Sequence, residues 1–136
     1  MISAPRLLLA IVSLLGCAGC ESLTTTHYGV SAARGHRERV EGLLQHFAKR
    51  ENLMRVAPET AGSTARFHPF VRYTGVLYPG LTLTAFDFAD SIEAQFTEHR
   101  YVLGGPSGTY NELQQRLRNE FHSSFGSDVR FRAEDQ

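Results

Sequence analysis

Arginine, histidine and glutamate recur at alternate positions in three segments of this chain. Alternate side chains of a strand point to opposite faces of a sheet, so these residues would share one face. Guanidinium groups match the geometry of carboxylate and phosphate, so this face could bind an anionic or carboxylate-bearing partner. The candidate binding residues are Arg66, His68, Arg72, Glu93, His99, Arg130 and Arg132.

An ordinary solvated face explains the same pattern, because an antiparallel sheet commonly exposes one polar face. A metal site is a weaker alternative. The six histidines show no metal-ligand spacing, although His68 and His99 could meet across the sheet. The glycine-rich segment 104–108 lacks the lysine of a phosphate-binding loop. We therefore expect no cofactor and no metal, and we assign no catalytic residue.

The chain has two cysteines, Cys17 and Cys20, and both follow an apolar run. Arg6 precedes this run, which extends over residues 7–15 and is followed by Gly16. A run of about 10 apolar residues is too short to cross a bilayer and is typical of a signal peptide.

The segment Leu14-Leu15-Gly16-Cys17 resembles the signal of a bacterial lipoprotein, and an ordinary secretory signal is the alternative. The resemblance covers only the first 20 residues. It implies removal of residues 1–16, lipidation of Cys17 (alternatively Cys20) and a lipidated tether over 17–26. Ala18 after the cysteine implies the outer membrane if the organism is Gram-negative.

Residues 27–136 are expected to form a single domain. Of the 14 Lys+Arg in the chain, only Arg6 lies in residues 1–16, which leaves 13 against 14 Asp+Glu and a formal charge of −1. This balance does not favour binding to nucleic acid. The expected partners are the membrane, through the lipid anchor, and an envelope protein.

Two segments show helical periodicity. Apolar residues recur at helical spacing within 32–50, and again from Thr109, where Thr109 and Glu112 have the spacing of a capping box.

Strands are expected over 53–56, 66–73, 81–88, 92–97 and 129–133. Pro69 suggests an edge strand or a bulge in the second of these, where Phe70 shares the polar phase. The apolar phase shifts within 81–88, which predicts a bulge there or burial on both faces.

These elements predict an α+β fold, a two-layer sandwich of a small antiparallel sheet with two amphipathic helices on one face. The arrangement could be ferredoxin-like if Thr24–Tyr28 adds a first strand.

Three functions are compatible with the sequence. The leading hypothesis is a non-enzymatic binding or assembly module beside the membrane. The second is a ligand-binding or hydrolytic domain acting on an envelope substrate, and the third is a structural subunit of an envelope complex. A pocket lined by Arg66, His68, Arg72 and His99 would favour the second, whereas a flat sheet face with an exposed apolar patch would favour the others.

Overall fold

The computed structural model describes residues 21–58, 68–102 and 104–135. The elements follow one another as β1 (Ser22–Ser31), α2 (His36–Arg50), β2 (Leu53–Val56), β3 (His68–Gly75), β4 (Leu81–Asp87), β5 (Ser91–Arg100), α3 (Gly108–Phe125), a 3₁₀ turn (Gly126–Asp128) and β6 (Arg130–Asp135).

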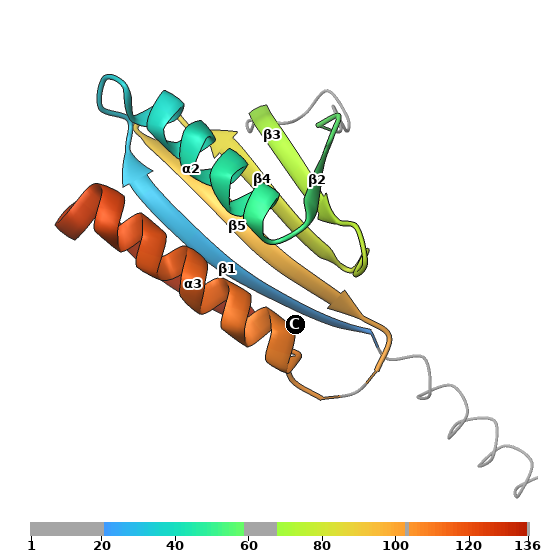
Figure 1. Ribbon diagram of the computed structural model, residues 1–136. Coiled ribbons are helices and arrows are strands. Elements are labelled where there is room, and N and C mark those ends of the chain that lie inside the picture. Colours follow the sequence, from blue (N-terminus) through green and yellow to red (C-terminus); the bar gives the residue numbers. More distant parts are fainter. Residues whose placement is uncertain (1–20, 59–67, 103, 136) are drawn as a thin grey trace, which may run out of the picture.

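The strands form one six-stranded sheet in the order β2-β3-β4-β5-β1-β6. Both helices lie against the same face of this sheet (Figure 1). The predicted α+β fold with two helices on one face is confirmed, but the sheet is larger than expected. All the described pairings are antiparallel.

Strand β1 accounts for much of the difference in size. Residues Ser22–Thr26, expected in the tether, belong to β1, which pairs with β5 on one side and β6 on the other. The expected tether therefore extends too far, and the alternative first strand over Thr24–Tyr28 is confirmed. The Thr24 and Thr26 side chains are buried under α3, where Thr26 Oγ1 lies 2.7 Å from the Tyr110 hydroxyl.

The helices cover the sheet with the apolar stripes seen in the sequence. In α2 the buried residues are Val40, Leu44, Phe47 and Ala48. In α3 they are Tyr110, Leu113, Leu117, Phe121 and Phe125.

The start of α3 differs from the predicted capping box. Ser107, not Thr109, is the N-cap, and its hydroxyl accepts a hydrogen bond from the Tyr110 N–H at 3.1 Å. The helix thus begins at Gly108, one residue before the expected start.

The core between sheet and helices is rich in aromatic rings. Phe96 of β5 stacks on Tyr110 at a centroid distance of 5.0 Å, and Tyr28 of β1 stacks on Phe121 at the same distance. Burial raises the pKa of the Tyr28 phenol far above its usual range, and it also raises the pKa of Tyr73. The Tyr28 hydroxyl donates to the Gln114 carbonyl at 2.9 Å. The buried Tyr73 hydroxyl has no hydrogen-bond partner in the described part of the chain.

A bulge near Pro69 reverses the face that Phe70 takes. The pairing of β3 with β4 shifts between Pro69 and Val71, as the proline suggested. Phe70 consequently packs against the core, with the Arg37 guanidinium of α2 at 4.7 Å from its ring centre. The expectation that Phe70 lies on the polar face is therefore wrong.

The apolar phase shift within 81–88 is not a bulge, because β4 pairs with β5 without a shift. Phe86 is instead partly buried on the face opposite to buried Leu83 and Ala85.

Candidate functional site: the open face of the sheet

The face of the sheet opposite the helices is called the open face here. The buried residues of β5, such as Ala94 and Phe96, point to the helices, so the alternate residues point away from them. The pairing register carries this phase to the neighbouring strands. The polar or aromatic residues of the open face include Thr25, His27, Arg72, Thr74, Thr82, Thr84, Phe86, Glu93, Gln95, Thr97, His99, Arg130, Arg132 and Glu134. Three apolar residues, Leu23, Met54 and Val56, have the same phase.

A hydrogen-bonded group, the histidine cluster, lies on β5, β1 and β6 of this face. His27 Nδ1 is 2.6 Å from Glu93 Oε1, and His27 Nε2 is 3.2 Å from Glu134 Oε2. The Gln95 amide donates to Glu93 Oε1 at 2.9 Å. The Arg132 guanidinium lies 3.4 Å from Glu134 Oε1. The register explains the grouping, because His27 is directly opposite both Gln95 and Arg132.

The cluster is satisfied by its own members. His27 is only 8% exposed although it faces away from the helices, because the surrounding side chains cover it. Its two carboxylate neighbours contact opposite nitrogens of the imidazole ring, so they do not converge on one point. In the described part of the chain, no three acidic, histidine or cysteine side chains are placed to hold a metal ion. The cluster can therefore present mixed charge to a partner.

The structure brings together three of the predicted site residues. Glu93 and Arg132 belong to the histidine cluster, and exposed Arg130 lies opposite Gly29, which pairs with Glu93 on its other side. Arg72 is on the same face but on β3, two strands away from β5. Arg72 therefore shares the face, as expected, but is remote from Arg130 and Arg132, because β4, β5 and β1 separate β3 from β6.

The possible contact of His68 with His99, which the sequence left open, is not formed, because their backbones lie far apart. The backbone of His68 pairs with Asp87, which pairs with Ile92 near the start of β5. His99 lies seven residues further along β5, or about 24 Å at the rise of a strand. Its Nε2 is 2.9 Å from a carboxylate oxygen of Glu21.

Three of the predicted site residues lie outside the described residues. They are Arg66 and the two cysteines, Cys17 and Cys20. The expected signal peptide over 1–16 lies outside them as well.

His27 and Glu134 were not predicted as site residues, although His27 is the centre of the cluster. The residues just before His27, 17–26, were interpreted as tether, so His27 was placed in a strand only in the alternative with a first strand over Thr24–Tyr28. A usable signal was the β-branched content of Thr24, Thr25 and Thr26, because threonine is enriched in strands. Glu134 lies just beyond the predicted end of the last strand.

A hollow of about 410 Å³ lies beside the cluster, at the end of the sheet where β1 ends and β5 begins. Its lining includes Glu93, Arg130 and Arg132, together with Asp90 and Asp128. Asp128 is engaged there, since it accepts a hydrogen bond from the Ser31 hydroxyl at 2.7 Å. The hollow thus offers both signs of charge to a bound group.

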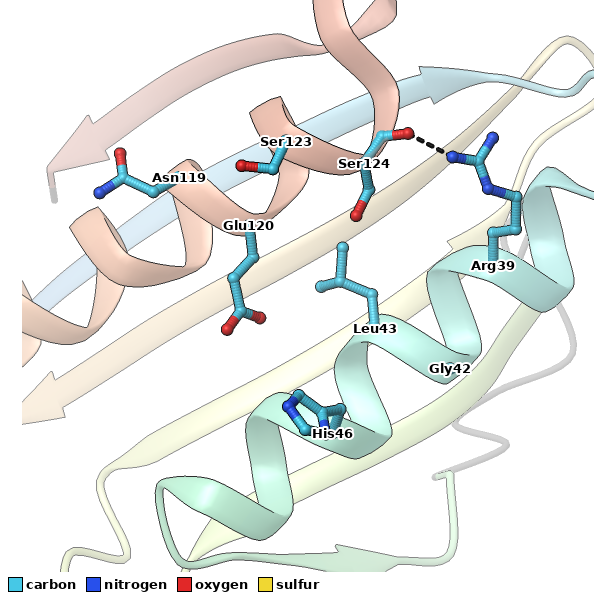
Figure 2. Close-up of a pocket in the computed structure, with 8 residues that line it drawn as sticks. All are labelled: Arg39, Gly42, Leu43, His46, Asn119, Glu120, Ser123 and Ser124. Atoms are coloured by element: carbon cyan, nitrogen blue, oxygen red, sulfur yellow. Dashed lines mark hydrogen bonds between the residues drawn. The ribbon is translucent and has the colours of Figure 1, made fainter.

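A second hollow, of about 440 Å³, lies between the outer sides of α2 and α3. Figure 2 shows Leu43 and His46 of α2 facing Glu120 and Ser123 of α3 across it. The Arg39 guanidinium closes one end by donating to the Ser124 carbonyl. Neither Arg72 nor His99 lines this hollow or the one beside the cluster.

No protein-family model and no curated protein matches this chain. The helices in the described part of the chain are not long and apolar enough for either to cross a membrane.

Proposed function

We propose that this protein is a lipid-anchored component of a bacterial cell envelope, in the outer membrane if the organism is Gram-negative, and that its domain is a non-enzymatic binding or assembly module. The observation that supports the binding role best is the open face, whose side chains are mostly polar. The two helices lie on the other side of the sheet and leave this face uncovered (Figure 1). Its arginines do not converge on a pocket with His99, which favours a surface contact over a reaction centre.

The position of β1 supports attachment close to the membrane. Only residues 18–21 separate Cys17 from Ser22, the first residue of β1. A chain of this length spans at most about 18 Å. The described domain would therefore lie against the lipid surface if Cys17 carries the acyl groups.

Acylation is tested by replacing the candidate cysteine. We expect Cys17→Ser to abolish labelling by radioactive fatty acid and to release the protein from isolated membranes, because no other acylated residue would remain. Cys20→Ser is the matched control and should leave both unchanged. Labelling that persists in Cys17→Ser and disappears in Cys20→Ser would place the lipid on Cys20.

Binding through the open face is tested by photo-cross-linking in intact cells. A photoreactive amino acid at Thr84, in the middle of this face, should capture a protein partner. The same amino acid at Gln115, exposed on α3, is the control and should not. Arg130→Glu should lower the yield of the adduct about tenfold, equivalent to about 1.4 kcal/mol, whereas Lys49→Glu on α2 should not. Capture from Gln115 alone would contradict the proposal.

A ligand-binding role is the second candidate, and the hollow beside the histidine cluster favours it. Arg130 and Arg132 line this hollow and could hold a carboxylate of a small envelope ligand, such as a cell-wall fragment. A ligand that raises the melting temperature, with the increase lost in Arg130→Ala, would favour this role over the first.

A further inference from the structure

In the described part of the chain, five of the six exposed large apolar side chains gather at one end of the sheet, and the sixth, Met54, is on β2. Leu77 is 87% exposed and Tyr101 is 73% exposed, and Val76, Tyr78 and Val102 are exposed as well. These five residues, called the apolar tip, belong to two segments: the β3–β4 turn and the segment that follows β5. The segments lie side by side, since the His99 N–H donates to the Gly80 carbonyl at 2.9 Å (Figure 1).

The β3–β4 turn is held in one conformation, so its apolar exposure is built into the fold. The Val76 N–H donates to the Asn52 carbonyl at 3.1 Å, and the Leu81 N–H donates to the Tyr78 carbonyl at 3.1 Å. A Cβ atom at Gly75 would collide with the Tyr78 carbonyl oxygen, and one at Gly80 would collide with that of His99. A surface ordered in advance loses little conformational entropy when it binds.

The opposite end of the sheet is different. There the β1–α2 loop, the β4–β5 turn and the 3₁₀ turn are made mainly of small and polar residues. In the described ranges, no large apolar side chain of these three segments is exposed. The loops and turns at one end of the strands therefore expose large apolar side chains, whereas those three segments at the other end do not.

The chain enters the domain at the apolar tip. Ser22, at the start of β1, pairs with Arg100, the residue before Tyr101. Glu21 lies beside the tip as well, since its carboxylate accepts from His99, whose ring is 4.7 Å from that of Tyr101. The 20 residues that precede Glu21 contain the apolar run and both cysteines. Under the proposed function, the tip faces the lipid surface at a distance of at most about 18 Å from the acylated residue.

We infer that the apolar tip docks onto the phospholipid bilayer that holds the anchor, and so orients the sheet with β1 rising from the membrane. This inference rests on the proposed function for the position of the bilayer. Leucine and valine side chains gain by leaving water, and tyrosine suits the boundary between lipid and water. Glu21 and Arg100 at the tip carry opposite charges, so docking should not require anionic lipid.

The test uses tryptophan fluorescence, because the chain contains no tryptophan. The full chain carrying Leu77→Trp is reconstituted in phosphatidylcholine vesicles with brominated acyl chains, which quench a nearby indole. The control is Ala89→Trp, at an exposed position of the β4–β5 turn at the opposite end. We expect quenching at position 77 and none at position 89, unchanged in high salt. Equal quenching at both positions, or none at position 77, would overturn the inference.

A second measurement separates this inference from the proposed anchor. The same quenching is measured in chains that also carry Cys17→Ser and Cys20→Ser, mixed with vesicles. We expect the tryptophan at position 77 to be quenched in these chains and the one at position 89 not to be. In a separate chain that carries Tyr101→Trp as the probe, adding Leu77→Ser should lower the vesicle-bound fraction about tenfold. Loss of fatty-acid labelling in Cys17→Ser reports on the anchor alone, because labelling does not depend on docking by the tip. Quenching that favours position 89 in these chains would contradict docking by the tip, whatever the acylation result.

Discussion

Strand β5 presents one glutamate to each face of the sheet, and the two carboxylates have different partners. Glu98, under the helices, is 1% exposed and accepts hydrogen bonds from the N–H and the hydroxyl of Ser107. Glu93, on the open face, binds His27 and Gln95 and remains partly accessible to water. On the covered face the Glu98 carboxylate is hydrogen-bonded by the start of α3, whereas on the open face the Glu93 carboxylate is hydrogen-bonded by neighbouring side chains.

This difference shows what each face requires. A buried charge is very costly unless it is hydrogen-bonded, so the position of α3 and the position of Glu98 depend on each other. Ser107 joins them, because its hydroxyl also accepts from the Tyr110 N–H in the first turn of α3. On the open face water can replace a lost partner, so substitutions there should cost less free energy and change binding more.

The largest expected contrast comes from adjacent residues of β5. Phe96 is fully buried between Phe47 and Tyr110, so Phe96→Ala should lower the free energy of unfolding by about 3–5 kcal/mol. Gln95→Ala, its control on the open face, should lower it by less than about 1 kcal/mol. Urea unfolding followed by circular dichroism measures both. Equal losses would mean that the two faces do not differ in burial as described.

The glutamate pair gives the next largest contrast. Glu98→Ala leaves the half-buried N–H and hydroxyl of Ser107 without their acceptor and should cost about 2–3 kcal/mol. Glu93→Ala should cost about 1 kcal/mol or less, because water can reach His27 once the carboxylate is gone. Glu98→Gln keeps an acceptor oxygen and should be intermediate. The same urea titration measures all three variants. A greater loss of unfolding free energy in Glu93→Ala than in Glu98→Ala would contradict the difference between the two faces.

Local periodicity was enough to predict the helices and the covered face. The apolar stripes of α2 and α3 and the alternation of Ile92, Ala94 and Phe96 were visible in the sequence and are buried as expected. The strand Leu53–Val56 is confirmed as β2. These features depend on neighbours in sequence, which is why one sequence can show them.

Features that depend on distant contacts could not be predicted in the same way. Thr26 is buried because it meets Tyr110 from α3, and Glu98 is buried because Ser107 reaches it; neither partner is visible in the local pattern. The prediction of the candidate site suffered most from this, because β1 lies between β5 and β6. Without β1 in the sheet, the contact of Glu93 and Arg132 through His27 could not be foreseen.

The smallest expected contrast concerns two buried tyrosines on the covered face. The Tyr28 hydroxyl has an acceptor in the Gln114 carbonyl, so Tyr28→Phe should lower the free energy of unfolding by about 1 kcal/mol. The Tyr73 hydroxyl has no described partner, so Tyr73→Phe removes a desolvated group and should leave stability unchanged or raise it by up to about 1 kcal/mol. Changes of opposite sign in the free energy of unfolding, measured by chemical denaturation, would show that a polar atom on this face stabilises the fold only where it has a hydrogen-bond partner. A loss of about 1 kcal/mol in both variants would mean that the Tyr73 hydroxyl also has a hydrogen-bond partner.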